Sequence, residues 1–287
     1  MTDKAQQFAQ KFIEAIESGL NDGKWTRPWN RVSSFPVNPA NDNYEYQGSN
    51  AMLLFMLGGG YWATYKQWKK LGAQVREGEK GTLVCRPITF VKEEDDGTKK
   101  RIGTGRFTYY SVFSSSQVDG WEEPEVAEGI DFQPMEAIEA DMKALGVPVH
   151  HGGGRAFYAP SQDRIQMPQP ETFHTVADYY TTLLHEGGHA TGHKSRLDRD
   201  LMTGRFGDEA YAFEELVAEL CSVFCAQHYG IALADEIDTN HVKYVKSWLK
   251  VLENDHTAIQ KAASLAERAS KYITQQQAVK EDIAEAA

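Results

Sequence analysis

The chain has 287 residues, 41% of them apolar, and a formal net charge of −11. It is long enough for two domains and apolar enough to bury a sizeable core, and it contains no run of residues that reads as a membrane span. Its three cysteines, together with an amino terminus that does not read as a cleavable signal, favour a reducing compartment, so we expect a cytoplasmic protein.

The negative charge belongs to the second half of the chain. Residues 1–120 carry 16 Lys plus Arg against 13 Asp plus Glu, whereas residues 121–287 carry 14 against 28. The first half is therefore slightly basic. A nucleic-acid partner is compatible with that half, although the net charge of the whole chain opposes one.

The first half begins with an amphipathic pattern. Residues 2–20 predict a helix whose apolar face carries Phe8, Phe12, Ile16 and Leu20. Residues 50–71 also read as helical, and residues 82–92 and 100–118 read as two strands around a turn at 95–98. These elements predict an α+β domain over residues 1–121.

Tryptophan and other aromatic residues of this half alternate with Lys and Arg. Unpaired bases stack on aromatic rings, at about 1–3 kcal/mol per base, and phosphates favour a basic groove, so this composition is typical of single-stranded DNA binding. The alternative is that most of these aromatic side chains belong to the core. The residues that we expect at a DNA surface are Trp25, Arg27, Trp29, Arg31, Asn50, Tyr65, Lys66, Trp68, Lys69 and Lys80.

An acidic, proline-containing stretch, residues 122–134, predicts a linker. Residues 135–287 then predict a second, mostly helical domain with a small β-sheet. A helix is expected over 135–145, short strands over 147–149, 155–160 and 164–167, and helices from 234 to about 272. The last of these strands, just ahead of the next helix, is expected to be an edge strand beside a cleft, where a peptide can pair as an added strand.

The most informative motif is His-Glu-x-x-His at residues 185–189, inside a helical pattern. Residues four apart on a helix project from one face, so His185 and His189 can bind one metal ion, with zinc expected first and Mn²⁺ or another divalent transition metal as alternatives. Glu186 is placed to act as general base for a water molecule. The alternative is a surface helix with two solvated histidines.

Gly187 and Gly188 lie between these histidines, although each costs a helix about 1 kcal/mol relative to Ala. We interpret them as sites where a backbone or a substrate approaches the metal closely.

A third ligand is expected from the helical run at residues 211–225. Glu215 and Glu219 are four residues apart, so Glu215 can bind the metal while Glu219 accepts the second ring N–H of a ligating histidine. Glu214 remains the alternative to Glu215, and a solvated acidic face is the simpler explanation of all three. His193 is a further alternative ligand, since position 195, where a metzincin has its third histidine, is Ser195.

Other metal-binding or polar side chains have simpler explanations. Cys221 and Cys225, four residues apart on a helix, are expected to be buried free thiols, with zinc ligation as the alternative. His241 and His256 are candidates to stabilise an oxyanion, although surface positions are the simpler reading, and no role is assigned to them.

Groups of residues in both halves match one known family. They are Trp25, residues 28–29, 36–38, 46–50, 65–68, Gly72 and 78–81 in the first half, and residues 155–158, 163–165, 185–193, 196–197 and 214–219 in the second. On these residues, and along nearly its whole length, the chain resembles the ArdC antirestriction proteins of conjugative plasmids. The sequence departs from the usual pattern at Gly187, where a large apolar residue often follows the glutamate.

The resemblance implies an N-terminal single-stranded-DNA-binding domain and a C-terminal zincin-like, gluzincin-type metallopeptidase domain. The implied role is protection of incoming plasmid DNA from restriction. The implied partner is single-stranded DNA, with double-stranded DNA as an additional candidate, and a restriction enzyme is the candidate protein substrate. Two alternative functions remain open. The first is a DNA-tethered protease, whose substrate is a restriction subunit or another DNA-bound protein. The second is a DNA-coating protein whose metal site is structural. A metal-dependent nuclease fits less well, because nuclease metals are usually held by carboxylates with Mg²⁺.

Overall fold

The structure is a computed structural model that describes residues 2–18, 20–21, 24–25, 35–93, 99–124, 134–173, 175–199, 209–231 and 241–275. Everything below refers to these residues. Most of the acidic stretch expected to be a linker, residues 125–133, lies outside the described residues, as do Arg27, Trp29, Arg31 and the turn expected at 95–98.

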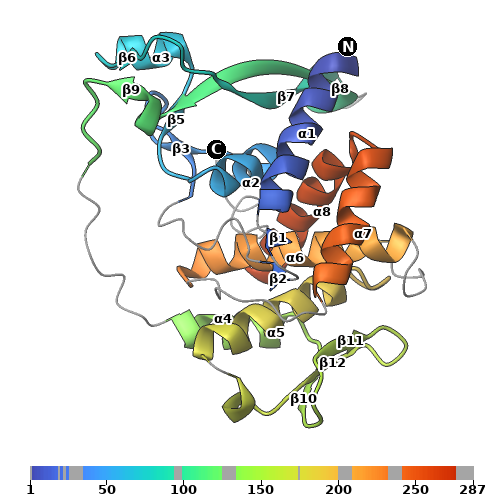
Figure 1. The fold of residues 1–287 in the computed structure, drawn as a ribbon. Helices are drawn as coiled ribbons and strands as arrows, with labels where there is room; N and C mark the ends of the chain where they lie inside the picture. Colours follow the sequence, from blue (N-terminus) through green and yellow to red (C-terminus); the bar gives the residue numbers. More distant parts are fainter. Residues whose placement is uncertain are drawn as a thin grey trace.

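The first half combines three helices with small antiparallel sheets (Figure 1). Its main feature is a long ribbon of two antiparallel strands, β7 and β8. The short strand β5 pairs antiparallel with the last residues of β8. The elements are α1 (Thr2–Ser18), β1 (Leu20–Asn21), β2 (Lys24–Trp25), β3 (Val37–Asn38), β4 (Tyr44–Glu45), α2 (Gly48–Met56), β5 (Trp62–Ala63), α3 (Tyr65–Lys70), β6 (Gln74–Val75), β7 (Thr82–Glu93), β8 (Lys99–Ser114) and β9 (Val118–Asp119).

The helix expected over residues 50–71 is two helices. α2 ends at Met56, and the chain turns at residues 58–60, three glycines with φ of 118°, 58° and 72°. Left-handed backbone of this kind suits glycine and ends a helix. A capping box between Thr64 and Gln67 then starts α3.

The second half is mostly helical, with one three-stranded sheet. Strand β12 is central, parallel to β10 and antiparallel to β11. The expectation that this strand lies at an edge is therefore wrong, because both of its sides are paired within the sheet. The three strands and the helix before them lie within two residues of their expected positions. The elements are α4 (Pro134–Ala144), β10 (Val149–His151), β11 (Phe157–Ala159), β12 (Arg164–Met167), α5 (Val176–Thr191), α6 (Glu209–Tyr229), α7 (His241–Asn254) and α8 (Ala258–Ile273).

The two halves share one hydrophobic core. Helix α1 packs against α7, and α2 packs against α8, while α5, α6 and α8 contact one another (Figure 1). Phe8 and Phe12, expected on the buried face of α1, join the same cluster of buried side chains as Trp248 and Ile259. The fold is α+β, as the sequence predicts. No helix among the described residues has the length and apolar character needed to cross a membrane.

Candidate metal centre

Helix α5 presents the histidine motif from its last two turns. It starts at a capping box in which the Thr175 hydroxyl accepts from the Asp178 N–H and the Asp178 carboxylate accepts from the Thr175 N–H. Tyr180, Leu183 and Leu184 are buried on its inner face. The capping box therefore fixes the start of the helix, and the motif lies near its other end, where Gly188 contacts α6.

The two glycines of the motif serve helix packing. A Cβ on Gly188 would lie 3.3 Å from the Cα of Ala218 and 3.3 Å from the Cβ of Cys221, both on α6. A Cβ on Gly187 would lie 3.1 Å from the end of the Met142 side chain. We expected these glycines to let a backbone or a substrate approach the metal closely. In the structure the backbone of α6 approaches Gly188 and the Met142 side chain approaches Gly187, so neither glycine leaves space for a substrate.

Close packing of α5 on α6 brings three candidate ligands together. His185 Nε2 lies 3.7 Å from one carboxylate oxygen of Glu215, and His189 Nε2 lies 3.5 Å from the other. One ligand atom from each residue can be chosen so that all three lie within 4.8 Å of one another. Ligand atoms at about 2.1 Å from a tetrahedral ion are roughly 3.4 Å apart, so this cluster fits a divalent transition metal.

Each histidine contacts a second carboxylate through its other ring nitrogen. His185 Nδ1 lies 3.4 Å from Glu219, and His189 Nδ1 lies 3.4 Å from Glu214. A carboxylate that accepts the Nδ1–H leaves the Nε2 lone pair for a metal. Glu219 therefore lies where its expected role requires. Glu214, the alternative ligand, lies behind His189 instead of among the Nε2 atoms.

Arg199 completes the site, although no sequence pattern predicts it. Its guanidinium donates to both oxygens of Glu214, to the Thr191 hydroxyl and to the Gly188 carbonyl. Arg199 is 6% exposed and Glu214 4%. Arg199 lies outside any helix or strand, in a stretch without periodicity, so no pattern distinguished it from the surface cations of the chain.

The buried charges shift one another's pKa. Burial lowers the pKa of both imidazoles, but Glu215 and Glu219 outweigh burial and hold the pKa of His185 well above its ordinary value. Glu214 and Glu215 likewise raise the pKa of His189 to about 9. Burial opposes ionisation of Glu215, yet the two imidazoles hold its pKa far below its usual range. A metal ion must therefore compete with protons for the Nε2 atoms.

Glu186 is the buried carboxylate next to this cluster. It is 7% exposed, and burial raises its pKa while the imidazoles of His185 and His189 lower it. The backbone of Tyr158 on β11 also lowers the pKa of Glu186. Because its pKa is raised, the Glu186 carboxyl beside the candidate metal ligands can take up a proton and release it again, as a general base requires.

His193 contacts a different group of residues. Its Nδ1 lies 2.7 Å from the Ser195 hydroxyl and 3.8 Å from Asp163. Asp163 in turn pairs with Arg196 and accepts from the Tyr158 hydroxyl at 2.6 Å. This network joins the β11–β12 turn to the segment after α5. Within the described ranges, His193 does not belong to the His185, His189 and Glu215 group.

The thiols on α6 are free and buried. Cys221 and Cys225 are each 0% exposed, and a hydrogen bond between the Cys221 thiol and Cys225, with burial, raises the pKa of Cys221 well above its usual value. The expectation of buried free cysteines is confirmed.

Two residues expected at a DNA surface are structural. Trp68 is 0% exposed, packs against Val75 and Val118, and donates its ring N–H to the Phe113 carbonyl. Its ring cannot stack on a base, because the surrounding apolar cluster covers it. The Asn50 amide bonds the backbone of Cys85 through both its nitrogen and its oxygen.

The other expected DNA residues are exposed or not described. Tyr65 is 46% exposed, and Lys66, Lys69 and Lys80 are also exposed. The side chain of Trp25 lies outside the described residues, together with Arg27, Trp29 and Arg31. The side chain of His241 is also outside them, and His256 is half-buried.

An HExxH helix packed on a carboxylate-bearing helix, beside a small sheet, defines a zincin-like protein. Residues 136–265 match the family described as zincin-like metallopeptidase, and residues 2–115 match the N-terminal domain of the anti-restriction factor ArdC. The chain belongs to the ArdC antirestriction family.

Solved structures and full-length relatives agree with this assignment. The metal-free crystal structure of the antirestriction ArdC protein from plasmid R388 superposes with a TM-score of 0.71 at 34% identity, covering 96% of this chain and 97% of that one. The Mn(II)-bound structure gives 0.69 at 33% identity, covering 94% and 97%. An uncharacterized protein of Sinorhizobium fredii, y4eC, is 38% identical over 96% of this chain and 93% of its own length.

A longer relative contains the same region. The DNA primase TraC of Escherichia coli is 37% identical over 93% of this chain, which spans 27% of the primase.

Proposed function

We infer that this protein protects incoming plasmid DNA from host restriction in the cytoplasm. In this proposal residues 1–121 bind single-stranded DNA, and residues 135–287 carry a metallopeptidase centre. The observation that carries the proposal is the position of Glu186, a buried carboxylate with a raised pKa directly beside the cluster of His185, His189 and Glu215. A purely structural metal site does not require such a carboxylate.

The residues of the site have separate roles in this proposal. His185, His189 and Glu215 hold a divalent metal, zinc first and Mn²⁺ as an alternative, while Glu219 and Glu214 orient the two imidazoles. The metal supplies Lewis acidity toward water and a peptide carbonyl. Glu186 removes the proton from the attacking water and delivers it to the leaving amine.

The substrate of this centre would be a protein that meets incoming DNA. A restriction enzyme subunit or another DNA-bound protein fits, because DNA held by the first half would keep the metal centre close to proteins on the same strand. The rival function is a DNA-coating protein whose metal site only stabilises the fold. The resemblance of the first half to the ArdC N-terminal domain supports DNA binding under both functions.

Glu186→Gln separates these two functions. The substitution keeps the size of the side chain and removes its ability to accept a proton. Cells carrying wild type, Glu186→Gln or the exposed control Glu171→Gln would be challenged with restriction-sensitive DNA, and each purified protein would be titrated with single-stranded DNA at several salt concentrations.

We expect Glu186→Gln to lose protection while its DNA affinity and salt dependence stay at the wild-type values. Full protection by Glu186→Gln would leave the DNA-coating function as the explanation. Absence of DNA binding by the wild type would refute both functions.

A further inference from the structure

The base of the β7–β8 ribbon carries exposed tyrosines beside a cation. Tyr44 on β4 is 49% exposed and Tyr110 on β8 is 39% exposed, and Arg86 on β7 is also exposed. Tyr110 pairs with Val84 and Thr108 pairs with Arg86 across the ribbon, so Tyr110 and Arg86 are diagonal neighbours on one face. None of these three residues was expected at a DNA surface.

Tyr44 belongs to the same face. Burial raises the pKa of the Tyr110 hydroxyl, and Cys85, Arg86 and Tyr44 are all close enough to act on that pKa as well. Alternation along residues 44–46 places Tyr44 and Tyr46 on one side of the segment, and burial, with the nearby Tyr110 hydroxyl, raises the pKa of Tyr46. The two exposed tyrosines and the arginine therefore form one surface, which we call the tyrosine platform (Tyr44, Arg86 and Tyr110).

The platform rests on a rigid base. Val84 and Val112, which share its face of the ribbon, are both 0% exposed. Tyr46 is 6% exposed and donates its hydroxyl to the Trp62 carbonyl at 3.0 Å. Aromatic rings held on a sheet lose little conformational entropy when a base stacks on them.

The charge near the platform suits a polyanion. The described parts of the ribbon, residues 82–93 and 99–114, contain six Lys or Arg and a single acid, Glu93. Three further acids, at positions 94–96, belong to the sequence that connects the two strands. In the register of the ribbon Glu93 pairs with Lys99 at the end far from Tyr110, together with Lys92, Lys100 and Arg101. The basic residues of the ribbon that lie nearer the platform are Arg86 and Arg106.

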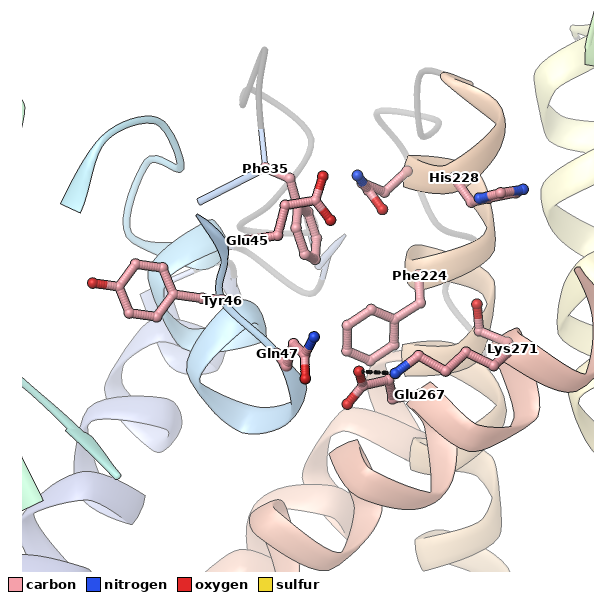
Figure 2. Close-up of a pocket in the computed structure, with 10 residues that line it drawn as sticks. Phe35, Glu45, Tyr46, Gln47, Phe224, His228, Glu267 and Lys271 are labelled. Carbon is pink, nitrogen blue, oxygen red and sulfur yellow. Dashed lines mark hydrogen bonds and ion pairs between the residues drawn. The ribbon is translucent and has the colours of Figure 1, made fainter. Parts of the chain in front are cut away.

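The neighbouring cavity has the opposite character. A pocket of about 360 Å³ lies between β4 and helices α6 and α8. Figure 2 shows Glu45 and Gln47 pointing into it, with Phe224 and the Glu267–Lys271 ion pair opposite, while Tyr46 points away. Lys271 balances the charge of Glu267, which leaves Glu45 as the carboxylate that repels phosphate there. Residues 45 and 47 therefore face this pocket, while Tyr46 faces away from it.

We propose that the tyrosine platform is a binding surface for single-stranded DNA, with bases stacked on Tyr44 and Tyr110 and a phosphate paired with Arg86. This inference rests on the proposed function and names the surface that performs its first part. The ribbon lies at the opposite end of the molecule from strands β10–β12 (Figure 1). DNA bound there leaves the sheet beside the metal centre accessible to a protein.

The test is a fluorescence anisotropy titration with a labelled oligothymidylate at several NaCl concentrations. Tyr44→Ala and Tyr110→Ala should each weaken binding about fivefold to hundredfold with an unchanged salt slope. Arg86→Gln should lower the slope of log affinity against log salt by about 1. Tyr110→Trp should restore wild-type affinity, because a larger ring still stacks. Circular dichroism would show that each variant is folded.

Matched controls come from the second half of the chain. Phe157→Ala removes an aromatic side chain that is 41% exposed, and Arg268→Gln removes an exposed cation, so both should bind within twofold of wild type. Wild-type binding together with unchanged affinity in folded Tyr44→Ala, Tyr110→Ala and Arg86→Gln would overturn the platform alone. A wild type that binds no oligothymidylate would refute the proposed function and the platform with it.

Discussion

Replacing the two adjacent glycines of α5 one at a time tests how the metal cluster is held together. Ala is favoured over Gly in a helix by about 1 kcal/mol at either position. The neighbours of the new methyl group differ. At Gly187 it meets the flexible end of Met142, at 3.1 Å, which can rotate away. At Gly188 it meets the backbone Cα of Ala218, at 3.3 Å, inside a buried helix.

The expected magnitudes follow from these neighbours. Gly187→Ala should stabilise the protein by up to about 1 kcal/mol, because only a methionine rotamer changes. Gly188→Ala forces α5 and α6 apart, and overpacking of this kind costs roughly 1–3 kcal/mol, which cancels or exceeds the gain in helix propensity. The two variants should therefore differ by about 1–3 kcal/mol. Glu215 lies about one helical turn before Ala218, and Glu219 follows it directly. A shift of α6 at Ala218 displaces both carboxylates, so Gly188→Ala should also weaken metal binding.

Urea unfolding of the metal-free variants measures the first effect, and calorimetric titration with Zn²⁺ or Mn²⁺ measures the second. We expect a higher midpoint for Gly187→Ala, an unchanged or lower one for Gly188→Ala, and weaker metal binding for Gly188→Ala alone. Equal stabilisation by the two substitutions, with equal metal affinity, would show that the α5–α6 contact does not set the ligand geometry.

Four further predictions concern the same structure. Because the pKa of His189 is raised to about 9, its imidazole carries a proton at neutral pH in the metal-free protein. Lowering the pH from 8 to 6 should therefore weaken metal binding at least about tenfold per pH unit. A calorimetric affinity that does not change with pH would contradict this. Arg199→Met leaves the buried Glu214 carboxylate without its guanidinium and should cost about 3–5 kcal/mol in urea unfolding, whereas a cost below about 1 kcal/mol would refute the pairing. Glu219→Gln should weaken metal binding about 10- to 100-fold without changing affinity for single-stranded DNA. Trp68→Ala should destabilise the protein by about 3–5 kcal/mol, while Trp68→Phe, still folded, should bind DNA as wild type does; weaker DNA binding by the folded variant would return Trp68 to the DNA surface.

Local patterns predicted the parts of the site that depend on helix geometry. The four-residue spacing of His185 and His189 fixes their common face, and the same spacing relates Glu215 to Glu219 on α6. The choice between Glu214 and Glu215 was not available from spacing. It depends on the rotation of α6 against α5, which the packing of Gly188 on Ala218 sets.

Long-range packing decided what the sequence left open. Arg199 acquires its role only when the segment after α5 folds back over Glu214. The aromatic and basic residues around Trp68 in the sequence suggest an exposed residue that stacks on bases. In the fold it is a core residue, because residues far away in the sequence, such as Val118, pack over it. The break after α2 was visible as a run of glycines at 58–60, but their left-handed φ values are a property of the folded chain.

The most direct test of the metal centre is a calorimetric metal titration of wild type beside Glu186→Gln, Glu214→Gln and Glu215→Gln. The geometry predicts one divalent ion per chain for the wild type and unchanged affinity for Glu186→Gln. It predicts a loss of about 10- to 100-fold for Glu214→Gln and a larger loss for Glu215→Gln. Near-normal binding by Glu215→Gln, with binding abolished in Glu214→Gln, would contradict the assignment of His185, His189 and Glu215 as the ligands.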